Sequence, residues 1–113
     1  MRWTLLIALT LAACSKGAEA DLPAIGEARS LGAEWALVNQ FRSHRLVTAT
    51  YAATMRARLR DQLRINLGSL AQPDSDYGRE IRALLAERDD ASPAELRAHA
   101  RALKQIEDKL ESA

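Results

Sequence analysis

Apolar side chains recur along the chain from residue 24 onward with the spacing of α-helices. In the segment 24–42 they follow one another at intervals of three or four positions, which places them on one helical face: Ala28, Leu31, Trp35, Val38 and Phe41. A second series runs at intervals of four and finally three: Tyr51, Met55, Leu59, Leu63, Leu67 and Leu70. Thr48 precedes this series and suits an N-cap, because its hydroxyl can accept a hydrogen bond from a backbone N–H. The pattern predicts helices over 24–42 and from Thr48 to about Ala71.

A third, shorter helix is predicted after a break. Pro73 lacks a backbone N–H and ends the second helix. Asp74 or Ser75 can then cap a helix that ends near Arg88. Its inward face is marked at helical spacing by Tyr77, Ile81, Leu84, Leu85 and Arg88.

The fourth predicted helix has the clearest start. Ser92 is the N-cap, Pro93 takes the first helical position, and Glu95 completes a capping box. One face then repeats at intervals of three and four: Leu96, His99, Leu103, Ile106 and Leu110. No alternating strand pattern of useful length occurs. We therefore expect an all-α fold, a small antiparallel bundle or hairpin of three to four helices that forms one domain over residues 24–113.

Composition narrows the classes of function. The chain has 16 Lys and Arg residues against 15 Asp and Glu residues, and one of the basic residues is Arg2, so the charges of residues 14–113 balance. A nucleic-acid-binding domain normally carries a strong basic excess, so we expect no nucleic-acid partner. The single cysteine, Cys14, excludes a disulfide within the chain.

The first fourteen residues have the layout of an export signal. Met1-Arg2-Trp3 supplies one fixed positive charge, and Thr4–Leu11 is an uncharged apolar run. This run is too short to span a bilayer, which needs about 20 apolar residues. The small residues Ala12 and Ala13 follow, and Cys14 comes directly after them.

This ending resembles the lipobox of bacterial lipoproteins, Leu-Ala-(Gly/Ala)-Cys, which Leu11, Ala12, Ala13 and Cys14 match position by position. The resemblance implies a signal peptide over 1–13, cleavage before Cys14, diacylglycerol on the Cys14 sulfur and often a third acyl chain. It also favours the outer membrane facing the periplasm, because Ser15 is not the Asp that retains such proteins at the inner membrane. The small polar residues 14–23 read as a flexible tether. The alternative is an N-terminal helix with an unmodified thiol at Cys14.

Residue patterns typical of catalysis are lacking. The sequence has no glycine-rich phosphate loop, no nucleophile elbow and no cluster of metal ligands. We therefore expect no enzyme, no catalytic residue, no cofactor and no metal. His44 falls in a predicted turn, where it would be solvated. His99 lies on the apolar face of the fourth helix, and a role as base or ligand would need carboxylates around it.

A row of basic residues on the second predicted helix offers one candidate surface. Arg56, Arg60 and Arg64 are spaced four apart, so they share one helical face. The row either faces acidic helices or water, or it meets an anionic surface such as lipid head groups or lipopolysaccharide phosphates. Arginine suits the second role because its planar guanidinium binds two oxygens at once.

The leading hypothesis is a lipid-anchored, non-enzymatic periplasmic module that binds another envelope protein through a helical surface. Large side chains left unburied would mark the contact, and Trp35, Phe41 and Tyr51 are the candidates; core packing is the alternative for each. A second hypothesis is a membrane-surface protein that uses the arginine row. A third is a small enzyme, which would need a cleft that gathers His99 with carboxylates, or an enzyme inhibitor.

Overall fold

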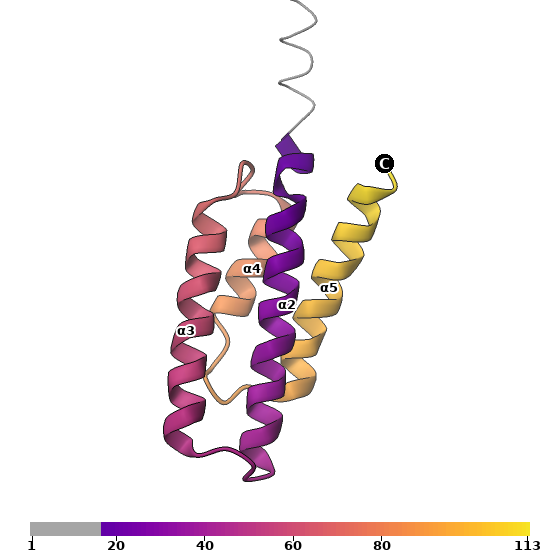
Figure 1. Ribbon diagram of the computed structural model, residues 1–113. Helices are drawn as coiled ribbons and strands as arrows, with labels where there is room; N and C mark the ends of the chain where they lie inside the picture. The colour runs from indigo at the N-terminus through magenta and orange to yellow at the C-terminus, as the bar shows by residue number, and fades with distance from the viewer. Residues whose placement is uncertain (1–16) are drawn as a thin grey trace, which may run out of the picture.

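The computed structural model describes residues 17–113 and folds them into four α-helices that run alternately up and down (Figure 1). They are α2 (Gly17–Ser43), α3 (Ala49–Gly68), α4 (Asp76–Leu85) and α5 (Pro93–Glu111). No residue of this described part is in a strand, so the expected all-α class is confirmed. Within the same residues, no helix combines the length and the apolarity needed to cross a bilayer.

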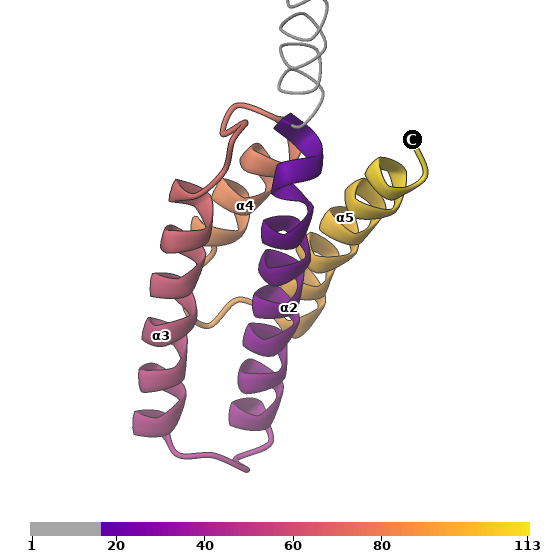
Figure 2. The same cartoon turned by 45° about the horizontal axis from the view of Figure 1, so that its top comes forward.

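The long helices α2 and α3 form an antiparallel hairpin, against which α4 and α5 pack (Figure 2). The most extensive helix contact is between α2 and α5, followed by that between α2 and α3. The start of α2, the α3–α4 loop and the C-terminus lie at one end of the bundle, and the α2–α3 turn lies at the other (Figures 1 and 2).

Side-chain caps fix three of the helix starts where the sequence predicts them. The hydroxyls of Thr48, Ser75 and Ser92 each accept a hydrogen bond of 3.1 Å from the backbone N–H three positions later. Of the two caps considered for α4, Ser75 is therefore the one used. Two helix ends come earlier than predicted. α3 stops at Gly68 rather than near residue 71, and α4 stops at Leu85 rather than near residue 88.

The expected tether is wrong for residues 17–23, which form the first turns of α2. The reason is Asp21, which is only 2% exposed. Its carboxylate accepts hydrogen bonds from the backbone N–H groups of Ala71 and Gln72, at 2.7 and 3.0 Å, and from the Tyr77 hydroxyl at 2.6 Å. These bonds dock the start of α2 on the α3–α4 loop, even though Pro23 lies inside the helix and removes a backbone donor.

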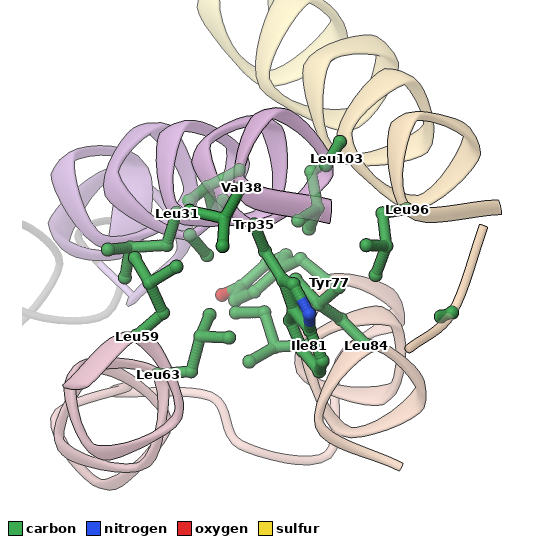
Figure 3. Close-up of a cluster of buried hydrophobic side chains, with 14 of the residues drawn as sticks. Leu31, Trp35, Val38, Leu59, Leu63, Tyr77, Ile81, Leu84, Leu96 and Leu103 are labelled. Atoms are coloured by element: carbon green, nitrogen blue, oxygen red, sulfur yellow. The ribbon is translucent and has the colours of Figure 1, made fainter. Parts of the chain in front are cut away.

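The core is a single cluster to which all four helices contribute (Figure 3). Trp35 lies between the hairpin and α4, and it is fully buried. The largest other fully buried side chains are Tyr77, Ile25, Leu59, Leu63, Ile81, Leu84, Leu96 and Leu103. The helical spacing read from the sequence therefore identified most of the buried positions correctly.

Candidate functional site

Large apolar side chains are exposed mainly at one end of the bundle. Four lie within the last two turns of α2, the α2–α3 loop and the first turn of α3: Leu37, Phe41, Leu46 and Tyr51 are 44%, 38%, 69% and 51% exposed. We call this group the apolar tip. The fifth exposed large apolar residue of the described part is Ile65, near the opposite end of α3. Exposed apolar side chains that gather in one place, rather than scatter, mark an interaction surface.

The backbone at the apolar tip is held by a Schellman motif. Arg45 adopts a left-handed conformation with φ of 57°. This conformation lets the Leu46 N–H donate to the Phe41 carbonyl at 2.8 Å and the Arg45 N–H donate to the Arg42 carbonyl at 3.1 Å. In this motif the residues in the positions of Leu46 and Phe41 frequently pack together. The turn therefore holds the backbones of these two apolar residues close together.

The rest of the apolar tip is set by helix geometry and capping. Leu37 lies one turn before Phe41 on the same face of α2. Tyr51 lies in the first turn of α3, where its N–H donates to the Thr48 cap. The Arg42 guanidinium also donates to the Val47 carbonyl at 3.2 Å, which ties the end of α2 to the residue before this cap. A loop held by these bonds loses little conformational freedom when a partner binds.

Two of the three residues considered as partner contacts are on the surface, and the third is not. Phe41 and Tyr51 belong to the apolar tip, whereas Trp35 is fully buried, so its assignment as a surface contact is wrong. Its indole N–H donates to the Asp89 carbonyl at 3.1 Å. Helical spacing alone could not separate Phe41 from Trp35, because both lie on the same apolar series. The same spacing does not select Leu46, although an apolar residue in a predicted connector indicates an exposed apolar side chain.

The arginine row is largely committed to contacts within the bundle. The Arg56 Nε donates to the side-chain oxygen of the buried Asn39 at 2.8 Å. Arg60 lies over the Trp35 ring, 4.5 Å from its centre, and donates to the Leu85 carbonyl at 2.7 Å. It thereby caps the C-terminal end of α4, because it satisfies the carbonyl of the last helical residue.

The charge of the row is also partly balanced. Arg60 pairs with Asp89 at 2.8 Å, and the exposed Arg64 pairs with Asp61 at 2.7 Å. Both carboxylates line the same shallow depression as Arg56, Arg60 and Arg64. Arg56 and Arg60 face the rest of the bundle rather than an open surface, so the row is not a continuous cationic face.

His99 does meet carboxylates in the fold. Its Nδ1 lies 2.7 Å from Glu80 Oε1, and its Nε2 lies 3.4 Å from Glu87 Oε1. All three side chains are mostly buried, and they link α5 to α4 and to the turn after it. Because each ring nitrogen lies next to a carboxylate, His99 could act as a base or a metal ligand only if it lost one of these two contacts. His44 is exposed in the turn after α2, as predicted.

The predicted lipid anchor at Cys14, with the lipobox residues Leu11, Ala12 and Ala13, lies outside the described residues. Residues 17–113 contain no group of three or more side chains that could hold a metal ion. Comparison with protein families, with curated proteins and with solved structures finds no match to this chain.

Proposed function

We propose that this protein is a lipid-anchored, non-enzymatic module of the bacterial envelope, which holds another envelope protein through its apolar tip. The observation that carries this proposal is the concentration of exposed Leu37, Phe41, Leu46 and Tyr51 at the end of the bundle where a hydrogen-bonded turn joins α2 to α3. A few large apolar side chains at the centre of an interface supply most of its binding energy. The lipobox supplies the anchor, and Ser15 favours the outer membrane, facing the periplasm.

The position of the apolar tip suits an anchored adaptor. α2 begins at Gly17, only three positions after Cys14, and the apolar tip lies at the far end of this helix of 27 residues. At 1.5 Å per residue, α2 spans about 40 Å. A bundle standing on its acylated N-terminus would therefore present the apolar tip away from its own membrane. A partner with an apolar groove could engage the tip there.

The two alternatives have less support. A membrane-surface role through the arginine row would need Arg56 and Arg60 to give up their bonds inside the bundle. An enzymatic role for His99 would need the ring to leave Glu80 or Glu87. The apolar tip needs no such rearrangement, because its side chains are already exposed.

The test is crosslinking in cells followed by recovery of the tagged protein. Wild type is compared with a Phe41→Glu/Leu46→Glu variant and with Ile65→Glu. The last is a matched control, because Ile65 is 73% exposed and lies near the other end of α3. We expect one envelope protein to be recovered with wild type and with Ile65→Glu, and to be lost with the double variant. A Cys14→Ala form should recover it weakly or not at all.

Two outcomes would refute the proposal. Recovery of the same protein with wild type and with the double variant would show that the apolar tip is not the contact. Recovery of lipid and lipopolysaccharide alone, from every form that carries Cys14, would favour the membrane-surface role instead. Circular dichroism of the double variant, compared with wild type, checks that loss of binding does not come from unfolding.

A further inference from the structure

A groove on the flank of the bundle combines positive charge with an apolar floor. It lies between α2 and α5, has a volume of about 270 Å³, and its lining is mostly apolar surface. Its residues are Arg29, Ala33, Arg97, Ala100, Arg101 and Lys104. We call it the α2–α5 groove. None of its residues belongs to the apolar tip or to the arginine row.

The walls of the α2–α5 groove are formed by α2 and α5, the helix pair with the most extensive contact within residues 17–113. Arg97, Arg101 and Lys104 recur at intervals of four and three, so they form one row along α5. The two apolar residues of the lining are Ala33 and Ala100, which we take as the floor of the groove. The two helices are in direct contact here: a β-carbon placed on the neighbouring Gly32 would lie 3.8 Å from the Ala100 methyl.

The positive charge of the α2–α5 groove is only partly neutralised from within. Arg29 lies 3.3 Å from Glu107, and Lys104 lies 3.3 Å from Asp108. Arg97 donates to the side-chain oxygen of Gln40, which is neutral. Arg101 has no ion pair within residues 17–113. Four cations thus face two carboxylates, which leaves an excess of two positive charges along the groove.

We propose that the α2–α5 groove is a second binding site, which takes an acidic amphipathic helix from a protein partner. The apolar side of that helix would lie on Ala33 and Ala100. Its carboxylates would pair with Arg97, Arg101 and Lys104, whose seven-residue span along α5 corresponds to about 10 Å. Glutamates at the same spacing on the incoming helix match that length.

A helix explains the groove better than a phosphate-bearing surface does. Phosphate contacts need cations but no apolar floor, whereas a helix needs both. The α2–α5 groove also lies on the flank of the bundle, away from the N-terminal end of α2. Arg29 is twelve positions beyond Gly17, which corresponds to about 18 Å along α2. This proposal goes beyond the function of the apolar tip and does not depend on it.

The test uses a synthetic helical probe. A peptide of about 18 residues is built from Ala and Leu on one face and Glu on the other; a second peptide has Lys in place of Glu. Each is titrated into the ¹⁵N-labelled Cys14→Ala protein at low salt. We expect the Glu peptide to shift the amide signals of Ala33, Ala100 and Arg101 with a dissociation constant below about 1 mM. The Lys peptide should cause no shift there.

Charge-reversal variants decide whether the groove is responsible. Arg97→Glu/Arg101→Glu should weaken the Glu peptide by about tenfold or more, because it replaces attraction by repulsion at two contacts. The matched control is Arg58→Glu/Lys109→Glu, which makes the same change in net charge at exposed positions outside the groove. This control should bind the peptide as wild type does. Circular dichroism establishes that both variants remain helical.

Three results would overturn the proposal. The first is the absence of shifts at about 2 mM peptide, and the second is equal affinity for wild type and Arg97→Glu/Arg101→Glu. The third is binding to phosphatidylglycerol vesicles that depends on Arg97 and Arg101 while the Glu peptide does not bind, which would assign the groove to phosphates. The Phe41→Glu/Leu46→Glu variant should bind the peptide normally, so failure of this site and failure of the apolar tip are distinguishable.

Discussion

Asp21 should be one of the most important single residues for the stability of the bundle. It lies in the first turns of α2, yet its three hydrogen-bond partners belong to the α3–α4 loop and to α4: Ala71, Gln72 and Tyr77. The perturbation is Asp21→Ala, which removes both acceptor oxygens. Asp21→Asn is the milder change, because it keeps the shape and one oxygen. Glu19→Ala is the matched control, since Glu19 is an exposed acid in the same part of the helix.

The magnitude follows from the bonds that are lost. A hydrogen bond to a charged group contributes about 1.5–3 kcal/mol, and a donor left buried costs about as much. Ala71 and Gln72 are exposed residues, so water can replace part of what their N–H groups lose. We therefore expect Asp21→Ala to lower the free energy of unfolding by about 3–4 kcal/mol and Asp21→Asn by about half of that. A loss of 3 kcal/mol lowers the melting temperature of a domain of this size by about 12–24 °C.

The same contacts give the stability a defined pH dependence. Burial raises the pKa of Asp21. The hydrogen bonds from Tyr77, Ala71 and Gln72 together lower it by more than burial raises it, so its pKa lies below the usual 3.8. The folded protein therefore binds this proton less readily than the unfolded chain does. The contribution of Asp21 is complete above the ordinary pKa and declines as the pH falls through the lowered folded value. Asp21→Asn should remove this acid-side decline.

Tyr77 acts at the alkaline end. Burial and the bond to Asp21 raise the pKa of Tyr77 from 10.0 to about 12. Its contribution is therefore complete below pH 10 and is lost as the pH rises from 10 towards 12.

Urea unfolding followed by circular dichroism, at neutral pH and near pH 3, measures the stability loss of the Asp21 variants and the acid-side decline in the Cys14→Ala protein. Asp21→Ala should unfold at much lower urea than the parent, whereas Glu19→Ala should stay within about 0.5 kcal/mol of it. A loss below about 1 kcal/mol for Asp21→Ala would refute the reasoning. It would mean that the start of α2 is not docked, and that residues 17–23 act as the tether that the sequence suggested.

Two further pairs of variants test the packing. A β-carbon at Gly78 would overlap the Pro73 carbonyl, so Gly78→Ala should lower the free energy of unfolding by about 3 kcal/mol or more. A β-carbon at Gly68 would meet no atom within 4 Å, so Gly68→Ala should leave the stability unchanged or slightly raised. Equal urea midpoints for the two variants would contradict this. Arg60→Ala should cost about 2–3 kcal/mol, because it uncaps α4 and uncovers the buried tryptophan. Arg64→Ala, which breaks only an exposed ion pair, should stay within about 0.5 kcal/mol of the parent protein, and a loss as large as that of Arg60→Ala would show that the two arginines are equivalent.

The features that the sequence predicted well are local ones. Thr48 and Ser92 cap helices where their neighbours indicate, because a cap depends on residues within one turn. Most of the buried faces of α3, α4 and α5 follow from spacing for the same reason, but Tyr51 and Arg88, which the spacing also assigned to these faces, are exposed. Asp21 was misread because its partners lie 50 or more positions away, so nothing near it distinguishes a buried acid from a solvated one.

The candidate site was predicted only in part, for a related physical reason. Spacing identifies an apolar residue but not whether another helix reaches it. Trp35 is covered by the α4–α5 segment and Arg60, whereas Phe41 lies beyond them at the end of the hairpin. The arginine row was likewise resolved only by the fold, which places the end of α4 and the buried Asn39 against it.

The proposed function depends first on the anchor, and one measurement tests it most directly. The protein is produced from its full sequence in a bacterium, purified from membranes in detergent, and its N-terminal peptide is examined by mass spectrometry. We predict that the mature chain begins at Cys14 and carries the mass of diacylglycerol on sulfur, with or without an acyl chain on the amino group. A chain that keeps Met1–Ala13, or that bears an unmodified Cys14 thiol, would contradict the anchored-adaptor function.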